Sequence, residues 1–274
     1  MWPAYCSQEE EGVAVNIYSQ KIKVDELDIH YLTGGQGDPL LVIHGGGDGA
    51  RAWRKNIEEL AEKYTVYVPD LPGYGRSQAI EGDYYIPELV EFVDKFTRSL
   101  GLKDFYLMGH SLGGGIALQY ALKFPHKLKK LVLVSSMFLG KEIVLWVRVL
   151  AQCVLCRSAA RVALALFRGV KWLVGKLFAS VEMVFPLTKF SISLGGKITT
   201  LGEQTTVLLY RLSEIMVPTL VVWGAKDPIL PVRQAYAAAR VIPDCQVKVF
   251  EGCGHSVYRE RLAEFSQTLT KFLG

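Results

Sequence analysis

The sequence predicts an α/β protein built on one mostly parallel, doubly wound sheet of about eight strands. Short apolar runs rich in β-branched residues alternate with segments that carry apolar residues at spacings of three and four. This alternation of strands and helices is typical of parallel sheets that are covered by helices. With 274 residues, 50% apolar and 21% charged, the chain can bury a large core and differs from disordered or collagen-like sequences.

The expected strands begin near the N-terminus. Residues 12–32 alternate polar and apolar side chains around a turn-like stretch at 23–26, which predicts an antiparallel pair at one edge of the sheet. The later apolar runs are short enough to be buried strands. They cover residues 40–43, 66–68, 105–108, 131–134, 220–223 and 247–250.

Helical periodicity appears between and after these runs. The apolar residues in these segments recur at a spacing that places them on one face of a helix. The expected helices cover residues 52–63, 87–100, 112–124, 233–241 and 260–272.

Residues 138–212 interrupt the alternation. The segment is rich in Leu, Val, Ala and Phe and has helical character, so we interpret it as a cap inserted into a core of residues 1–137 and 213–274. It contains ten basic and three acidic residues. We expect its apolar face to cover a pocket and its residues to bind substrate. Contact with a membrane surface is the less favoured alternative, and no stretch has the roughly 18 apolar residues of a membrane-spanning helix.

Charge and cysteine content limit the expected partners. The net charge of +4 is mild and no basic cluster is interleaved with aromatic residues, so no nucleic acid is expected. The five cysteines lack a framework spacing, which favours free thiols in a reducing compartment. Cys153 and Cys156 lack the two further ligands that zinc requires, so we expect no metal and no cofactor. The acidic start lacks the basic region of a signal peptide, which predicts a cytoplasmic protein.

The candidate chemistry begins directly after the expected strand 105–108. Gly109-His110-Ser111-Leu112-Gly113 matches the pattern G-x-S-x-G and precedes an expected helix. Glycines suit a turn so sharp that flanking side chains would clash, and the turn lifts the serine hydroxyl clear of the sheet. The helix N-terminus adds amides and a positive potential where an oxyanion forms. Ser111 is therefore the predicted nucleophile.

A serine nucleophile needs a base and an orienting carboxylate, and both follow in the expected order. Asp227 stands in the loop after the expected strand 220–223, and His255 stands in the Gly-rich loop after 247–250. Open α/β sheets place their sites at these carboxyl ends of strands. Taken singly, Asp227 could form an Asx turn and His255 a helix cap. Their joint occurrence with Ser111 favours a catalytic set of all three residues.

The oxyanion is expected to bind two backbone amides. His44-Gly45-Gly46-Gly47 follows the expected strand 40–43, and glycines leave the backbone N–H groups open to substrate. The predicted donors are the amides of Gly46 and of Leu112, the residue after the nucleophile. His44 is interpreted as a structural imidazole that braces the glycines.

Together these motifs resemble the α/β-hydrolase superfamily over nearly the whole chain. The matching pieces are HGGG at 44–47, PDLPGYGRS at 69–77, GHSLGG at 109–114, WGAKD at 223–227 and GCGH at 252–255. The resemblance implies the α/β-hydrolase fold, a structural turn without catalytic role at Asp70, and a cap inserted after the sixth strand. It also implies acyl chemistry, because haloalkane dehalogenases and epoxide hydrolases carry an aspartate where this chain has Ser111.

We therefore expect a serine hydrolase that cleaves a carboxylic ester. Ser111 attacks the carbonyl carbon, His255 removes and then donates the proton, and Asp227 orients the imidazole. The two amides hold the oxyanion, and water cleaves the acyl-enzyme. The apolar cap favours a small, uncharged substrate with an apolar acyl group.

Three other functions stay open. Residues 45–53 resemble the corresponding loop of meta-cleavage carbon–carbon bond hydrolases, although Asp48 replaces a usual proline and Ser256 a usual tryptophan. Basic residues of the cap could bind the carboxylate of a dienoate substrate. A slow-turnover ligand receptor of the same fold would hold its ligand stoichiometrically. An acyltransferase would deliver the acyl group to an alcohol in place of water.

Overall fold

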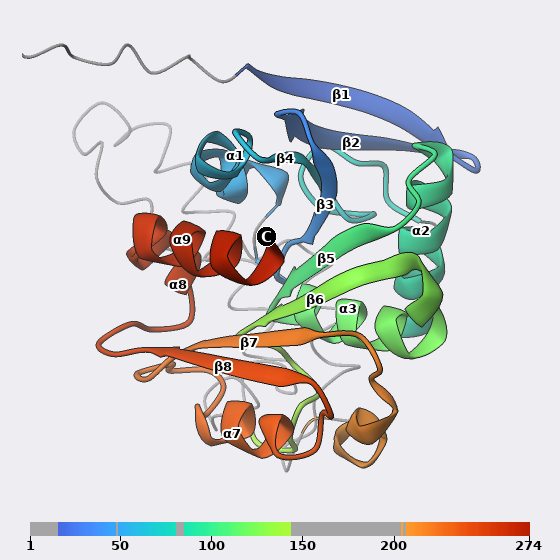
Figure 1. Cartoon of the computed structure of the whole chain (residues 1–274). Helices are drawn as coiled ribbons and strands as arrows, with labels where there is room; N and C mark the ends of the chain where they lie inside the picture. Colours follow the sequence, from blue (N-terminus) through green and yellow to red (C-terminus); the bar gives the residue numbers. More distant parts are fainter. Residues whose placement is uncertain (1–15, 48, 81–84, 144–203, 205–206) are drawn as a thin grey trace, which may run out of the picture.

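A computed structural model describes residues 16–47, 49–80, 85–143, 204 and 207–274. An eight-stranded sheet runs through its centre (Figure 1). In sequence order its strands are β1 (Ile17–Val24), β2 (Leu27–Gly34), β3 (Asp38–Ile43), β4 (Tyr64–Pro69), β5 (Phe105–His110), β6 (Leu128–Val134), β7 (Thr219–Gly224) and β8 (Cys245–Phe250).

The strand order is β1-β2-β4-β3-β5-β6-β7-β8. Every neighbouring pair from β4–β3 to β7–β8 is parallel, whereas β1–β2 and β2–β4 are antiparallel. The prediction of a mostly parallel sheet with an antiparallel pair at one edge is therefore confirmed. The turn of that pair lies at Asp25, whose φ of 49° is a left-handed conformation that aspartate tolerates better than most residues.

The helices largely follow the expected segments. Residues 50–53 form a 3₁₀ turn before α1. The last expected helix corresponds to α9, and a break at Arg261 (φ −137°, ψ 55°) separates it from the short preceding helix α8. The Arg261 carbonyl accepts a bond from the Phe265 amide at 2.8 Å, so Arg261 is the N-cap residue of α9. The helical elements are η1 (Ala50–Trp53), α1 (Arg54–Leu60), α2 (Ile86–Ser99), α3 (Leu112–Lys123), η2 (Pro125–Lys127), η3 (Leu209–Glu214), α7 (Arg233–Ala239), α8 (Val257–Glu260) and α9 (Leu262–Leu273).

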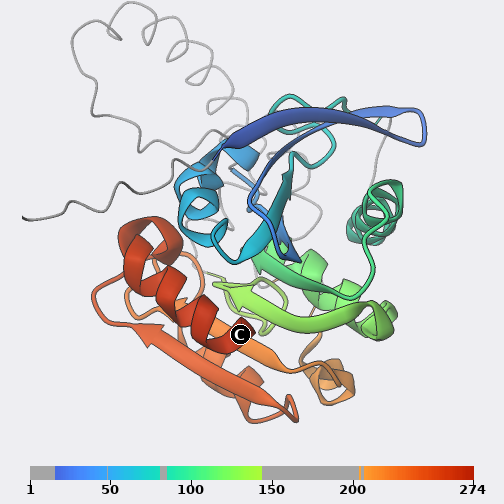
Figure 2. The same ribbon diagram turned by 45° about the horizontal axis from the view of Figure 1, so that its top comes forward.

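Helices cover both faces of the sheet, as a doubly wound fold requires (Figure 2). Successive residues of β3 point to opposite faces. Leu41 and Ile43 join the core beneath α2, α3 and α7, while Leu40 and Val42 join the core beneath α1 and α9. Because both faces of β3 are buried, residues 40–43 are all apolar in the sequence.

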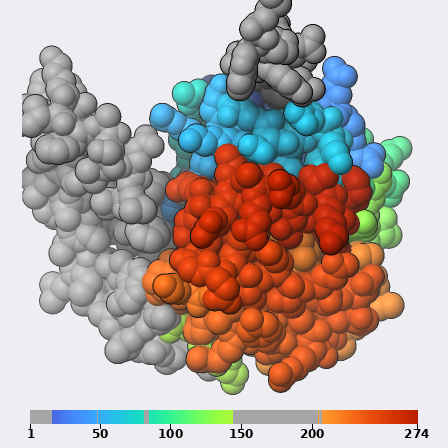
Figure 3. Space-filling view, turned by 60° about the vertical axis from the view of Figure 1, so that its left-hand side comes forward, coloured from blue at the N-terminus to red at the C-terminus, as the bar shows by residue number. Residues whose placement is uncertain are grey.

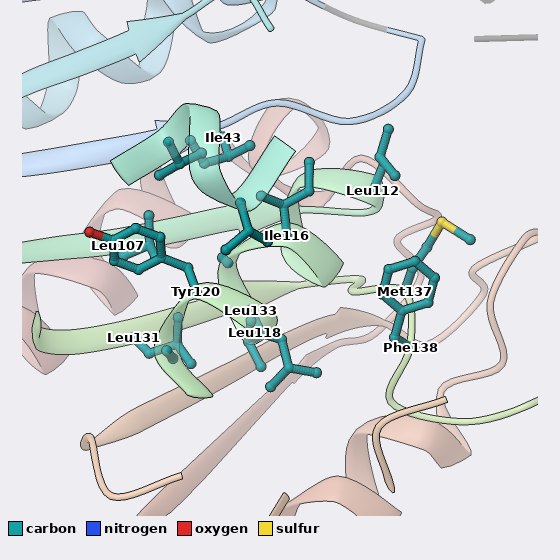
Figure 4. Close-up of a cluster of buried hydrophobic side chains, with 14 of the residues drawn as sticks. Ile43, Leu107, Leu112, Ile116, Leu118, Tyr120, Leu131, Leu133, Met137 and Phe138 are labelled. Atoms are coloured by element: carbon teal, nitrogen blue, oxygen red, sulfur yellow. The ribbon is translucent and has the colours of Figure 1, made fainter. Parts of the chain in front are cut away.

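The core on the α3 face supports the turn where β5 passes into α3. Ile116 and Tyr120 of α3 are fully buried against Leu107 and Leu133 of the sheet (Figure 4). Phe138, just after β6, is also fully buried in this cluster. The start of α3 is thereby held in place by close packing.

On the opposite face, α9 spans the surface between two regions that are distant in sequence. Figure 3 shows it in red, between the region of α1 in cyan and that of α7 and β8 in orange. None of the helices that the structure describes is long and apolar enough to cross a membrane.

Most of the predicted cap, residues 144–203 with 205 and 206, lies outside the described residues, and so do Cys153 and Cys156. The two described ends of the segment pair with each other. The Gln204 side chain accepts from the Phe138 amide at 3.0 Å and donates to the Gly140 carbonyl at 2.7 Å. The Leu208 amide donates to the Phe138 carbonyl at 2.9 Å. The chain thus leaves and re-enters the core at one place, while the division into core and cap stays a prediction.

Candidate active site

Ser111 stands between β5 and α3 in a conformation that side chains rarely adopt. Its φ is 53° and its ψ is −116°. Its amide donates to the Val134 carbonyl at 2.9 Å, and its carbonyl accepts from the amides of Gly115 at 3.2 Å and Met137 at 3.0 Å. The surrounding chain therefore fixes this strained backbone, as expected where strain serves a function.

The glycines of the motif are required by close backbone contacts. A Cβ atom at Gly109 would lie 2.2 Å from the Gly113 carbonyl oxygen, and one at Gly113 would lie 2.2 Å from the Ile43 carbonyl oxygen. Both positions exclude any side chain, since carbon and oxygen cannot approach so closely without backbone movement. The predicted reason for glycine on both sides of Ser111 is thus seen in the packing.

His255 and Asp227 form a hydrogen-bonded pair at the ends of β8 and β7. His255 Nδ1 lies 2.8 Å from Asp227 Oδ2, and the Asp227 side chain is fully buried while that of His255 is 10% exposed. The other carboxylate oxygen, Oδ1, accepts from the amides of Ile229 at 2.8 Å and Leu230 at 3.0 Å. Because a carboxylate only accepts, Nδ1 is the donor and Nε2 is left to accept a proton.

Burial and hydrogen bonding act in opposite directions on Asp227. Burial alone would raise the pKa of its carboxyl group. The hydrogen bond and positive charge of His255, with the amides of Leu230 and Ile229, outweigh burial and hold the pKa below its ordinary value. Asp227 is therefore a carboxylate at neutral pH.

The structure brings the three predicted residues to one region, but it bonds only two of them directly. His255 is bonded to Asp227, whereas no hydrogen bond joins Ser111 to His255, both of which the structure describes. The connection runs through His110, whose Nε2 donates to the His255 carbonyl at 3.0 Å. The residue that precedes Ser111 thus contacts the backbone of His255.

An aromatic stack supports this connection. The His110 ring lies 4.9 Å from the Tyr258 ring and 4.8 Å from the His255 ring. Tyr258 in turn stacks on Trp53, with ring centroids 4.0 Å apart and planes 5° from parallel. Residues from three distant parts of the sequence therefore pack beneath the His255 loop.

The residues that carry the predicted oxyanion donors, Gly46 and Leu112, are neighbours in space. Leu112 is the first residue of α3, and a Cβ atom on Gly46 would lie 3.6 Å from its Cδ2. A Cβ atom at the preceding Gly45 would lie only 2.8 Å from His110 Nδ1 and 3.3 Å from the Ser111 Cβ. The glycine loop therefore passes directly over the motif that contains Ser111.

His44 and Asp70 have the structural positions that the sequence suggested. His44 Nδ1 donates to the Gly45 carbonyl at 2.8 Å, and its Nε2 accepts from the Leu71 amide at 3.0 Å. Asp70 accepts from the amides of Ala50 at 2.6 Å and Arg76 at 2.9 Å. His44 thus bonds within the glycine loop as a brace would, and Asp70 joins the turn after β4 to the start of η1.

Two residues near the site were missed by sequence reasoning. His110 was treated only as the variable position of the G-x-S-x-G pattern, although a polar residue beside the nucleophile is a signal in itself. Glu260 was treated only as the start of a helix, yet its carboxylate accepts from the Gly254 and Ser256 amides. A carboxylate five residues after a candidate catalytic histidine is within reach of that loop.

The expected substrate-binding residues within 138–212 lie mostly outside the described residues. A described cavity of about 330 Å³ lies elsewhere, at the C-terminal half of α3, where α2 and η3 complete its walls. It is therefore separate from the Ser111 turn at the N-terminus of α3. Among the residues that the structure describes, no cluster of His, Cys, Asp and Glu could hold a metal ion.

Comparison with known proteins identifies the family. The profile of the alpha/beta hydrolase fold family matches residues 38–171 and 173–262. The 2-hydroxy-6-oxo-6-phenylhexa-2,4-dienoate hydrolase of Burkholderia cepacia is 27% identical over 263 residues, which cover 89% of this chain and 91% of the relative. This chain belongs to the alpha/beta hydrolase family.

Two solved structures extend the comparison. A bacterial membrane phospholipase A superimposes with a TM-score of 0.71 at 25% identity, covering 94% of this chain and 86% of the other. The carboxylesterase CesB of Bacillus subtilis superimposes with a TM-score of 0.74 at 21% identity, covering 94% and 92%. The second likeness shows the fold alone. Family membership supports an enzyme that hydrolyses a small-molecule substrate.

Proposed function

We propose that this protein is a serine hydrolase that cleaves a carboxylic ester through Ser111, His255 and Asp227. One observation carries the proposal. A serine in a strained, positive-φ turn at a helix N-terminus follows His110, which is bonded to the backbone of His255, and His255 is already bonded to a buried carboxylate. This combination supplies the nucleophile, the base and the orienting group that acyl transfer needs.

In the proposed reaction the Ser111 hydroxyl oxygen attacks the ester carbonyl carbon while His255 Nε2 takes the hydroxyl proton. The imidazolium then gives that proton to the leaving alcohol as the ester C–O bond breaks. Water attacks the acyl-enzyme with His255 again as the base, releasing the acid and restoring Ser111. The bond from Ser111 to His255 forms when substrate binds, since such catalytic bonds are commonly long in the free enzyme.

The backbone amides of Gly46 and Leu112 are the proposed oxyanion donors. They belong to adjacent segments, and the Leu112 amide lies at the first turn of α3, where helix N–H groups point outward. Each such donor is worth about 3 to 4 kcal/mol of barrier in comparable sites.

Asp227 holds the imidazole in the required tautomer. Its lowered pKa keeps it ionised, so that it accepts the Nδ1 proton and stabilises the imidazolium that forms during the reaction. It does not itself take up the proton.

An ester is the favoured substrate class because a serine nucleophile with two amide donors suits acyl transfer. The printed names of two structures that this chain resembles, a membrane phospholipase A and a carboxylesterase, are consistent with this choice. We propose that residues within 138–212 bind an apolar acyl group, which gives a small-molecule substrate and no cofactor.

A second candidate is hydrolysis of a carbon–carbon bond. The observation in its favour is the 27% identity to the dienoate hydrolase of Burkholderia cepacia over 89% of this chain. Such a reaction would use His255 and the same oxyanion donors on a 2-hydroxy-6-oxo-dienoate.

The test is a series of p-nitrophenyl esters from short to long acyl chains, alongside a 2-hydroxy-6-oxo-dienoate. We expect ester turnover that disappears in Ser111→Ala, with an optimum chain length that measures the acyl site. Dienoate cleavage with negligible ester turnover would replace the ester assignment with the second candidate. Ester turnover that persists in Ser111→Ala would contradict the proposed nucleophile.

A further inference from the structure

The loop that carries His255 is held by a carboxylate on its own short helix. Glu260 Oε2 accepts from the Gly254 amide at 2.8 Å, and Oε1 accepts from the Ser256 amide at 3.2 Å. These amides belong to the residues immediately before and after His255. One carboxylate thus binds the backbone on both sides of the proposed base.

A further bond fixes the same stretch from the opposite side. The His110 imidazole donates to the His255 carbonyl at 3.0 Å. The three backbone groups of residues 254, 255 and 256 are therefore bonded to two side chains, one from the Ser111 turn and one from α8. The imidazole ring itself is held by its bond to Asp227.

Glu260 contributes to geometry more than to stability. The residue is exposed, and hydrogen bonds at an exposed site compete with water. The interior of this region is held independently, because Val257 and Tyr258 are fully buried and Asn56 donates to the Tyr258 carbonyl at 3.0 Å. Loss of the Glu260 carboxylate should leave the helix packed while the loop before it gains freedom.

We propose that Glu260 is a positioning residue that sets the His255 imidazole between Asp227 and Ser111. This inference rests on the proposed function of His255 as the base. The direction of the Cα–Cβ bond of His255 is set by the peptide planes on either side of it. Holding both planes fixes where Nδ1 and Nε2 fall, and a displacement of about 1 Å can cost on the order of 100-fold in rate.

The two-point contact requires a carboxylate. Glutamine has the same shape but a single acceptor oxygen, and its NH₂ group would face an amide N–H, which is also a donor. Glu260→Gln therefore keeps one bond and loses the other, whereas Glu260→Ala loses both. Glu260→Asp keeps two acceptors on a shorter side chain.

The matched control is Glu264, an exposed acid in the first turn of α9. Its carboxylate pairs with Lys248 at 2.8 Å. Glu264→Gln removes the same charge and makes the same chemical change a few residues away, where no contact with the His255 loop is lost. Any general effect of charge or of helix stability appears in both variants.

Steady-state kinetics on the preferred p-nitrophenyl ester provide the first readout. We expect kcat to fall on the order of 100-fold in Glu260→Ala and about tenfold in Glu260→Gln, with KM and Tm nearly unchanged. Glu260→Asp should recover part of the loss, and Glu264→Gln should match the wild type. A kcat in Glu260→Ala within about twofold of the wild type, or a loss shared equally by Glu264→Gln, would overturn the proposal.

A spectroscopic readout separates this inference from the proposed function. The proton between His255 Nδ1 and Asp227 gives a far-downfield ¹H NMR signal, assigned by its loss in Asp227→Asn. We expect the signal to broaden or shift in Glu260→Ala and to persist in Glu264→Gln. An unchanged signal in Glu260→Ala would refute the positioning role, even if ester turnover proved independent of Ser111. A changed signal together with activity that survives Ser111→Ala would refute only the proposed function.

Discussion

Among the residues that the structure describes, Ser-His-Asp sets occur at two places, and only one of them is the proposed catalytic site. In the first, His255 Nδ1 lies 2.8 Å from Asp227 Oδ2 near the Ser111 turn. In the second, His30 Nδ1 lies 2.7 Å from Asp70 Oδ2, and Ser19 Oγ lies 2.8 Å from His30 Nε2. By these distances alone the second is the more complete relay.

The two arrangements differ in the backbone that carries each serine. Ser19 lies inside the regular edge strand β1, opposite Leu32 of β2, and no helix begins beside it. Ser111 has a φ of 53° and directly precedes α3. A helix N-terminus and neighbouring glycines can offer several amides to one oxyanion, whereas a regular edge strand points successive amides in opposite directions.

The histidines differ as well. His30 is part of β2, its amide donates to Ser77 Oγ at 3.0 Å, and its carboxylate partner Asp70 also binds the Ala50 and Arg76 amides. This second cluster ties an edge strand to two loops. His255 instead lies in a loop whose backbone is held and whose ring remains partly exposed. The proposed site therefore differs from the second cluster in its strained serine and in the helix N-terminus beside that serine.

The largest expected difference concerns the two serines. Ser111→Ala should lower kcat about 10⁴-fold or more, because the nucleophile is lost. Ser19→Ala should leave kcat within about twofold of the wild type, since it is a surface substitution outside the site. A fluorophosphonate probe, which bonds to an activated serine as fluoride leaves, should label the wild type and Ser19→Ala but not Ser111→Ala. Labelling of Ser19 in the Ser111→Ala background would remove the distinction drawn between the two relays.

The second contrast concerns the orienting carboxylate. Asp227→Asn should lower kcat about 10⁴-fold with little change in KM, because an amide can donate to Nδ1 and favour the wrong tautomer. The measurement is steady-state kinetics on the preferred ester, with circular dichroism to verify folding. A loss below about tenfold would show that the His255–Asp227 bond is structural, like that of His30 and Asp70.

The third contrast is one of stability. His30→Ala should lower the free energy of unfolding by about 3 kcal/mol, because it removes one partner of a buried pair. Its kcat per folded molecule should stay within about threefold of the wild type, whereas His255→Ala should abolish turnover. Urea denaturation and kinetics on the same samples supply both quantities. Loss of turnover in His30→Ala without loss of stability would assign the second cluster a functional role.

The smallest expected effect is the pH dependence contributed by Asp227. Its folded-state pKa is lowered, so the unfolded chain binds this proton more readily than the folded one. The stabilisation is therefore complete above the ordinary aspartate pKa of about 3.9 and is lost as the pH falls through the lower folded-state value. Urea denaturation from pH 6 downward should show a steeper loss of stability in the wild type than in Asp227→Asn. Parallel curves would contradict the lowered pKa.

Much of the proposed site could be recognised before the fold was known. Ser111 lies in a local pattern, and Gly109 is required by a contact with Gly113 inside that pattern, whereas Gly113 is required by the distant Ile43 carbonyl. Asp227 and His255 were placed because each follows a strand, and parallel strands bring their carboxyl ends to one edge. The roles of His110 and Glu260 could not be predicted in this way. They depend on which backbone groups the two side chains contact, and those contacts are seen only in the structure.

The sequence by itself determined the alternation of strands and helices and the identity of the strained turn. Both depend on local properties, the period of apolar residues and the absence of a side chain on glycine. Only the tertiary structure decided the strand order β1-β2-β4-β3 and with it the approach of His30 to Asp70, 40 residues away. It also decided the contact between His110 and His255, 145 residues apart. Such contacts arise when distant segments pack, and no local pattern specifies the angles at which their side chains meet.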